Sequence, residues 1–119
     1  SQFIENNLVE VPELIGKMAE MTVGMVTESV DGFVKKDLKL CRKVIDDDDQ
    51  VDDAFNQVKE ELATLMYQNL DAKAGLDLLM TAKYMERIGD HAVNIAEWVE
   101  YAITGNHRNN EHQMGGNQA

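Results

Sequence analysis

Apolar residues recur at alternating three- and four-residue spacing along almost the whole chain, and short polar segments interrupt this pattern only twice. The three resulting stretches cover about residues 12–35, 37–70 and 73–105, with the second turn expected at 68–73. Such spacing places the apolar side chains on one face of an α-helix. Because short connections make successive helices antiparallel neighbours, the chain is predicted to be all-α, an antiparallel three-helix bundle that runs up, down and up.

Residues typical of helix ends support these bounds. Pro12 suits a first helical position, Asp37 is a good N-cap, and Gly105 is a natural residue just after a helix. A chain of 119 residues supports one domain. We therefore expect a lead-in segment at 1–10, the bundle at 11–105, and a disordered, polar, glycine-containing tail at 106–119.

The chain has a formal net charge of −11, with 22 acidic and 11 basic residues. A nucleic-acid partner needs a basic surface, so this balance argues against that class, and it equally disfavours adsorption to anionic lipid. Cations and basic protein surfaces are the favoured partners. Cys41 is the only cysteine, no apolar run approaches the length of a membrane span, and the N-terminus lacks a signal-peptide pattern. We therefore expect a cytoplasmic protein without direct membrane insertion.

The apolar arc of the third stretch is unusually broad. A stripe defined by Tyr84, Ile88 and Ile95 is expected to belong to the core-facing side, and four residues widen it: Leu78, Ala82, Met85 and Ala96. A helix that is apolar over a wide arc buries more than one face. We therefore expect an additional packing partner, which is either a second three-helix repeat, a second copy of the chain, or another protein.

Four side chains able to bind a cation lie on one side of the third stretch. Glu86, Asp90, Asn94 and Glu97 stand at positions i, i+4, i+8 and i+11, which share a ridge on an α-helix. Gly89 lies among them, although glycine inside a helix costs roughly 1 kcal/mol relative to alanine. A glycine at this position predicts that another group approaches the backbone closely.

The second stretch carries a run of aspartates. If its apolar residues face the core, Asp48 and Asp52 lie nearer to that face, whereas Asp49 and Asp53 point to solvent. Like charges one helical turn apart repel each other, so either water or a bound cation must compensate them. Because the turn is short, Asp48 and Asp52 reach nearly the height of Asp90 in the bundle. The two acidic groups then form either one shared site or two adjacent ones.

Carboxylates and one amide form an all-oxygen ligand set, which suits hard cations such as Mg²⁺, Ca²⁺, Mn²⁺ or ferric iron. Spacing alone fits a solvated helix face equally well. Catalysis has little support, because no glutamate is followed three residues later by a histidine, as di-iron oxidases require, and no glycine-rich phosphate loop is present. The chain is predicted to be a binding module rather than an enzyme.

The stretch from Met85 to Glu97 resembles the ERIGDHA signature of the PhoU family, the bacterial regulators of phosphate uptake and phosphate signalling. The resemblance covers roughly residues 11–105. Members of that family usually carry two three-helix repeats, and this sequence holds one. The resemblance implies either a fragment or a single-repeat relative, with a second repeat or a homo-oligomer completing the packing.

The resemblance also implies a multinuclear metal cluster, which PhoU relatives bind through paired (Glu/Asp)-x-x-x-Asp motifs. Asp48 with Asp52, and Glu86 with Asp90, match that motif here. Iron is the metal that the resemblance favours, with manganese, magnesium, calcium or zinc as alternatives. The full set of candidate metal ligands is Asp48, Asp52, Glu86, Asp90, Asn94 and Glu97.

By resemblance, the chain negatively regulates high-affinity phosphate uptake and phosphate-starvation signalling through protein contacts. The implied partners are the cytoplasmic side of the phosphate ABC transporter and the sensor kinase of the phosphate two-component system. The alternative is a metal-free helical adaptor or oligomerisation module, whose acidic face recognises a basic partner. A metalloenzyme of the phosphatase or oxidase type ranks last among these hypotheses.

Overall fold

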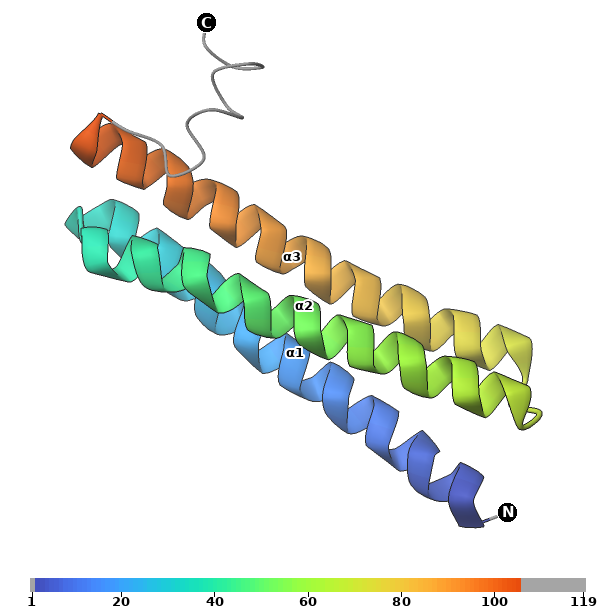
Figure 1. Ribbon diagram of the computed structural model, residues 1–119. Helices are drawn as coiled ribbons and strands as arrows, with labels where there is room; N and C mark the ends of the chain where they lie inside the picture. Colours follow the sequence, from blue (N-terminus) through green and yellow to red (C-terminus); the bar gives the residue numbers. More distant parts are fainter. Residues whose placement is uncertain (1, 106–119) are drawn as a thin grey trace, which may run out of the picture.

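Three long helices lie side by side in the computed structural model, which describes the backbone of residues 2–105 and the side chains of residues 10–105 (Figure 1). They are α1 (Gln2–Lys35), α2 (Leu38–Tyr67) and α3 (Ala72–Thr104). Each helix packs against both of the others. The predicted all-α, antiparallel three-helix bundle is confirmed, while the predicted tail at 106–119 lies outside the described residues.

Capping residues set the starts of α2 and α3 and the end of α3. The carboxylate of Asp37 accepts a hydrogen bond from the Leu40 amide at 3.2 Å and so caps the start of α2. Asp71 caps α3 in the same way, accepting from the Ala74 amide at 3.1 Å. Gly105 ends α3 with φ of 75°, a left-handed conformation that glycine adopts without strain. The N-cap at Asp37 and the helix end at Gly105 are therefore confirmed.

The first helix begins at Gln2, so the predicted start near Pro12 is wrong. The apolar spacing of Ile4, Leu8, Val11 and Ile15 continues the helical pattern upstream of the proline. A proline removes one amide donor from the helix, and Pro12 is exposed, so its ring does not occupy the core. The proline therefore lies inside the helix instead of starting it.

The core combines large side chains from two helices with small ones from the third. Eight fully or nearly fully buried residues come from α1 and α2: Met18, Thr22, Met25, Val44, Val51, Val58, Leu62 and Leu65. The side that α3 turns to the core is built instead from the small-residue seam, defined as Gly75, Ala82, Gly89, Ala92 and Ala96. Small side chains let α3 approach its neighbours closely.

Several large apolar residues of α3 consequently lie on its outer side. Tyr84 is 56% exposed, Ile88 is 37% exposed and Ile95 is 39% exposed. The prediction that this stripe faces the core is therefore wrong. A hydropathy pattern gives large apolar side chains more weight than alanine and glycine, although the small residues are the ones that pack closely here. Because the apolar arc of α3 is broad, a substantial part of its apolar surface stays exposed in the single chain.

One buried ion pair joins α2 to α3 near the first hairpin. Arg42 Nε lies 2.9 Å from Glu100 Oε2, and the Glu100 side chain is only 3% exposed whereas that of Arg42 is 54% exposed. Among the described residues, no group donates a hydrogen bond to the other buried oxygen, Oε1 of Glu100. Arg42 is therefore the partner that makes burial of this carboxylate tolerable.

A tight contact between α1 and α2 gives the first testable prediction. A Cβ placed on Gly32 would lie 2.7 Å from the Sγ atom of buried Cys41. We expect Gly32→Ala to lower the free energy of unfolding by about 1–3 kcal/mol, because the added methyl group must displace a fully buried thiol. Urea unfolding followed by circular dichroism measures the change.

The chain supplies two controls for this prediction. Gly24→Ala meets no described atom within 4 Å, so it should stabilise the helix by about 0.5–1 kcal/mol. Adding Cys41→Ala to Gly32→Ala removes the clashing sulfur and should recover part of the loss. Equal stability of Gly32→Ala and the parent protein would show that this hairpin is more loosely packed than the structure indicates.

Candidate metal centre

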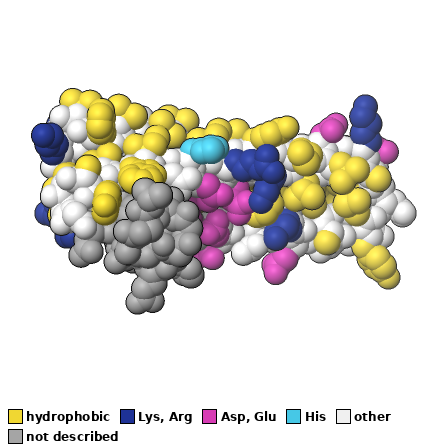
Figure 2. All heavy atoms as spheres, turned by 90° about the horizontal axis from the view of Figure 1, so that it is seen from above, with side chains coloured by type: hydrophobic (Ala, Val, Ile, Leu, Met, Phe, Trp, Pro, Cys, Tyr) yellow, Lys and Arg dark blue, Asp and Glu magenta, His cyan; other side chains and the backbone are white. Residues whose placement is uncertain are grey.

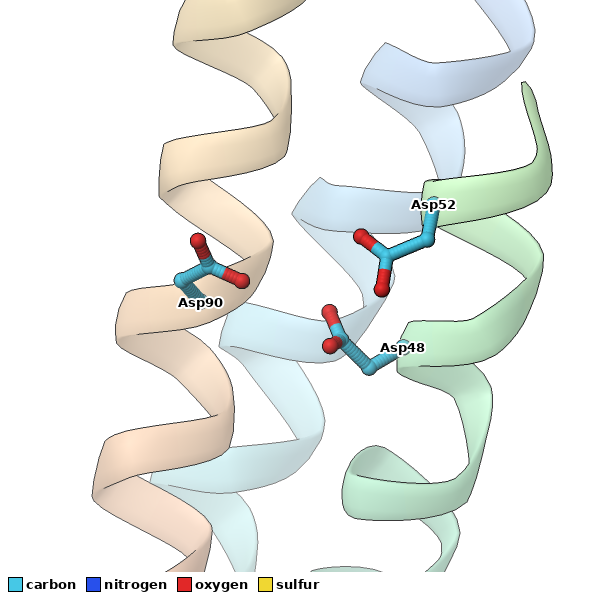
Figure 3. A group of neighbouring side chains, drawn as sticks. All are labelled: Asp48, Asp52 and Asp90. Atoms are coloured by element: carbon cyan, nitrogen blue, oxygen red, sulfur yellow. The ribbon is translucent and has the colours of Figure 1, made fainter. Parts of the chain in front are cut away.

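Three carboxylates from two helices meet between α2 and α3, about midway along the bundle. Asp48 and Asp52 of α2 point toward α3, and Asp90 of α3 turns its carboxylate toward them (Figure 3). One oxygen of each carboxylate lies within 4.8 Å of the others. We call these three residues the acidic triad. Both aspartates of the predicted α2 group therefore meet Asp90 of the predicted α3 group at one place.

Helix periodicity and the second hairpin account for this convergence. Asp48 and Asp52 are one turn apart and therefore project from the same side of α2. The short turn between Tyr67 and Ala72 sets α3 antiparallel to α2, which returns Asp90 to the same height. Their neighbours on α2, Asp49 and Asp53, are exposed, as expected.

Electrostatics at the triad disfavours the fully ionised state when no cation is bound. Burial, and after it repulsion from the carboxylates of Asp52, Asp90, Asp49 and Glu86, together raise the pKa of Asp48 to about 6. The pKa values of Asp52 and Asp90 are also raised, in each case first by burial and then by Glu86. Three carboxylates that resist ionisation together form a site that a cation would stabilise.

The Asp48 carboxylate is the member of the triad with a buried oxygen that lacks a hydrogen-bond donor among the described residues. Its Oδ1 atom is buried, and within residues 10–105 no hydrogen-bond donor reaches it. Asp48 is half-buried and this oxygen is closed to bulk solvent, unlike the exposed carboxylates of Asp49 and Asp53. A buried carboxylate oxygen without a donor, next to two other carboxylates, fits a hard cation that prefers oxygen ligands.

Glu86 adjoins the triad but already has partners. Its side chain is hydrogen-bonded to Asp52 and accepts a hydrogen bond from Lys83 Nζ at 2.6 Å. The Lys83 ammonium also lies 5.3 Å from the centroid of the Phe55 ring, with the Lys59 ammonium 4.9 Å from the same centroid. Glu86 thus stands between the acidic triad and a basic group at its edge.

The structure does not bring the last two predicted ligands into the triad. Asn94 is exposed and lines an apolar groove together with Phe33 and Trp98. Glu97 is buried at 6% exposure and lies outside the group of three carboxylates. Their assignment as metal ligands stays a prediction.

Gly89 lies buried directly beneath the acidic triad. A Cβ at this position would lie 3.4 Å from Thr22 Cγ2, 3.5 Å from Asp48 Oδ1 and 3.6 Å from Val51 Cγ1. These are ordinary van der Waals distances, so atoms of α1 and α2 surround this backbone without the tight contact that the sequence predicted. An added methyl group would stand in van der Waals contact with the buried oxygen of Asp48.

Sequence analysis missed the groups that flank the triad. Lys59 and Lys83 are 24 positions apart in the sequence, so no local pattern relates them to the Phe55 ring that both approach. The same holds for Arg42 and Glu100, which are 58 residues apart.

Comparison with protein families identifies the chain independently of the site. Residues 15–99 match the family model described as PhoU domain. No solved structure matches the chain. Within residues 2–105, none of the three helices combines the length and the hydropathy needed to cross a lipid bilayer.

Curated relatives agree with the family match. The chain is 36% identical over 92 residues to a phosphate-specific transport system accessory protein PhoU homolog of Caulobacter vibrioides, covering 76% of this chain and 40% of that protein. It is 32% identical over 88 residues to PhoU homolog 1 of Methanothermobacter thermautotrophicus, covering 73% and 40% of the two chains. Similarity to the homolog of Zymomonas mobilis is 38% identity over 89 residues, with 74% and 38% coverage. The chain thus spans about two fifths of the length of these relatives, and it belongs to the PhoU family.

Proposed function

We propose that this chain is a metal-binding regulatory domain that restrains high-affinity phosphate uptake and phosphate-starvation signalling through protein contacts in the cytoplasm. Its curated relatives are named as accessory proteins of the phosphate-specific transport system, which supports a regulatory rather than a catalytic role. The buried and unpartnered oxygen of Asp48 within the acidic triad is the observation that carries the metal part of the proposal.

The triad would hold the metal through Asp48, Asp52 and Asp90. Glu86 could become a fourth ligand once its hydrogen bond with Asp52 is broken. Four carboxylates in one place are enough to support more than one ion, in keeping with a multinuclear cluster. Iron is the proposed metal, with manganese, magnesium, calcium and zinc as alternatives. Bound metal would supply positive charge that fixes α2 against α3.

Regulation would follow from this fixed pair of helices. Three protein carboxylates leave coordination positions open on a six-coordinate ion, and phosphate oxygens are suitable ligands for them. The Lys83 ammonium at the edge of the triad adds a positive charge for such an anion. We propose that phosphate status thereby changes the surface offered to the phosphate ABC transporter and the phosphate sensor kinase.

A metal-free adaptor is the second candidate function. The net charge of −11 favours it, because an acidic surface of this strength attracts basic partners without any metal. In that case the acidic triad would be protonated in part, and partner binding would weaken with added salt.

Elemental analysis by inductively coupled plasma mass spectrometry, on protein without a tag, tests the proposed function. We expect at least about one metal ion per chain after reconstitution with ferrous iron or manganese, since the triad supplies a single compact set of oxygen ligands. The double variant Asp48→Asn/Asp90→Asn should lose this metal, because it removes two of the three carboxylates.

The matched control is Asp49→Asn/Asp53→Asn, which changes the charge equally at two exposed positions of α2. It should keep the metal. Equal metal content in both double variants would mean adventitious binding to acidic surface, and no metal in any of the proteins would make the adaptor the leading function.

A further inference from the structure

A basic group lies directly beside the acidic triad. In Figure 2, Lys and Arg side chains adjoin the acidic side chains at the middle of the bundle. Lys83 of α3 contacts one of these acids, because its Nζ atom lies 2.6 Å from Oε1 of Glu86, three residues further along the same helix. A contact this short is a charge-assisted hydrogen bond, in which the ammonium donates and the carboxylate accepts.

Glu86 acts on every member of the triad. Its side chain is hydrogen-bonded to Asp52. Burial is the first cause of the raised pKa of each of the three aspartates, and the charge of Glu86 raises each of these pKa values further. The Glu86 side chain is only 14% exposed, so water screens this repulsion weakly. Glu86 is therefore the fourth carboxylate of the site, next to the triad.

Lys83 supplies the opposite charge. Burial and Glu86 raise the pKa of Asp90, whereas the charges of Lys83 and His91 oppose this rise. The positive charge of Lys83 therefore reaches the triad as well as Glu86. The Lys83 side chain is 41% exposed, so its ammonium can leave Glu86 for water at a small cost, as in a surface ion pair. A more highly charged cation can thus break this contact.

The Phe55 ring holds the lysine close to the triad. The Lys83 ammonium lies 5.3 Å from the centroid of this ring, within the range of a cation–π interaction. The Lys59 ammonium lies 4.9 Å from the same centroid. Two positive charges at one ring repel each other, and the ion pairs of residues 10–105 give a carboxylate partner to Lys83 but not to Lys59. Phe55 and Lys59 therefore direct the Lys83 ammonium toward Glu86.

An ammonium at Glu86 affects any cation that enters the triad. The Glu86 oxygen that Lys83 occupies is not available to a metal ion, and two cations at neighbouring carboxylates repel each other. A monovalent ion brings no more charge than the ammonium, which has the additional advantage of being tethered to the helix. An ion with two or more charges gains more from the four carboxylates than the lysine does. The charge of the incoming ion therefore decides whether it displaces Lys83.

We propose that Lys83 is a tethered cation that competes with metal ions for Glu86, and that it thereby lowers the metal affinity of the site and excludes monovalent ions. This inference rests on the proposed function, because it requires a metal at the acidic triad, and it adds the residue that controls binding there.

Isothermal titration calorimetry with Mn²⁺, on the full chain after treatment with a chelator, tests the inference. Lys83→Met removes the charge but keeps the length of the side chain, so it should bind Mn²⁺ about tenfold more tightly than the parent protein. Lys83→Arg keeps the charge and should retain the weaker affinity of the parent. Lys59→Met is the matched control, because it removes a charge from the same ring but not from Glu86, and it should change the affinity far less.

Thermal unfolding gives a second measurement, which a mere loss of packing would not reproduce. Without metal, Lys83→Met should have a Tm about 2–4 °C below that of the parent, because Glu86 loses its partner. Saturating Mn²⁺ should remove this deficit. Replacing choline chloride by potassium chloride at the same concentration should raise the Tm of Lys83→Met and leave the Tm of the parent and of Lys83→Arg unchanged.

The outcomes separate this inference from the proposed function. Equal Mn²⁺ affinity of the parent and Lys83→Met, or an equal gain in Lys59→Met and Lys83→Met, would overturn the inference and leave the proposed function intact. If neither Mn²⁺ nor ferrous iron binds to any of these proteins, both fail. Circular dichroism checks the helical fold of each variant, which substitution of partly exposed lysines should preserve.

Discussion

Adding the correct metal to the chelator-treated protein will raise its Tm by about 10 °C when the metal is present at a hundred times its Kd. Binding to the folded state alone contributes about 2.7 kcal/mol at that ratio. In a domain of this size, each kcal/mol shifts Tm by about 4 °C. The structural reason is that one ion bound by Asp48, Asp52 and Asp90 joins α2 to α3 and removes the repulsion among the three carboxylates. Thermal unfolding followed at 222 nm, with each candidate metal in turn, measures the shift.

The dependence on pH distinguishes this site from the acidic surface in general. Protons compete with metal at Asp48, whose pKa is raised to about 6, so the metal-induced shift should fade as the pH falls through about 6. Without metal the trend reverses. The folded state binds a proton that the unfolded chain has released, so stability falls by about 1–2 kcal/mol as the pH rises from about 4 through about 6. Asp48→Asn should reduce both trends, because the raised pKa values of Asp52 and Asp90 remain, and Asp53→Asn should preserve them. A metal-induced shift in Asp48→Asn as large as that of the parent protein would contradict the site.

Replacing Arg42 with alanine will lower the free energy of unfolding by about 3 kcal/mol, although the arginine itself is half exposed. The cost arises at Glu100, whose buried carboxylate would keep no described partner at either oxygen. The double variant Arg42→Met/Glu100→Leu should recover most of the loss, because an apolar pair of similar size carries no buried charge. Guanidinium chloride unfolding gives both values.

Lys43 provides a matched comparison on the next residue of α2. It pairs with Glu28 at 3.0 Å and with Asp47 at 2.9 Å, but both carboxylates are nearly one third exposed. Lys43→Ala should therefore cost less than about 1 kcal/mol, as surface ion pairs do. If Arg42→Ala and Lys43→Ala cost the same, water reaches Glu100 and the pair is not a buried one.

Local sequence patterns were sufficient for the helices and for part of the site. Apolar spacing and the capping residues at Asp37 and Gly105 are properties of single helices, so they could be recognised without knowledge of the packing. The convergence of Asp48, Asp52 and Asp90 needed only the period of the helix and a short turn. These features depend on neighbours in the sequence or on one hairpin, which is why they were predictable.

Of the four predicted ligands on one ridge of α3, only Asp90 lies in the acidic triad, and the geometry of the helix explains why. A step of four residues advances about 400° around the helix, which leaves about 40° of rotation per step. Asn94 is therefore rotated outward relative to Asp90 and reaches the apolar groove. Glu97, after a step of three, turns back and is buried. Similar spacing in the sequence thus ends in three different environments.

Which side of α3 faces the core could not be read from hydropathy. Ala82, Ala92 and Ala96 carry less apolar surface than Tyr84 or Ile95, yet the alanines are fully buried. The alanines are favoured on the core side because they let two other helices approach α3 closely, which is a property of the assembled bundle. Partners far apart in the sequence, such as Arg42 and Glu100, are also set by the assembly alone.

The small-residue seam of α3 also determines which substitutions the domain can accept over evolutionary time. In an ordinary helix core, truncation of large side chains does most of the damage. At Ala82, Ala92 and Ala96 there is almost nothing to truncate, and every enlargement must displace a neighbouring helix, at a cost of typically 1–3 kcal/mol. Sequence drift at these positions is thus confined to a few small residues, while the outer side of the same helix remains free to change size and chemistry with its partner.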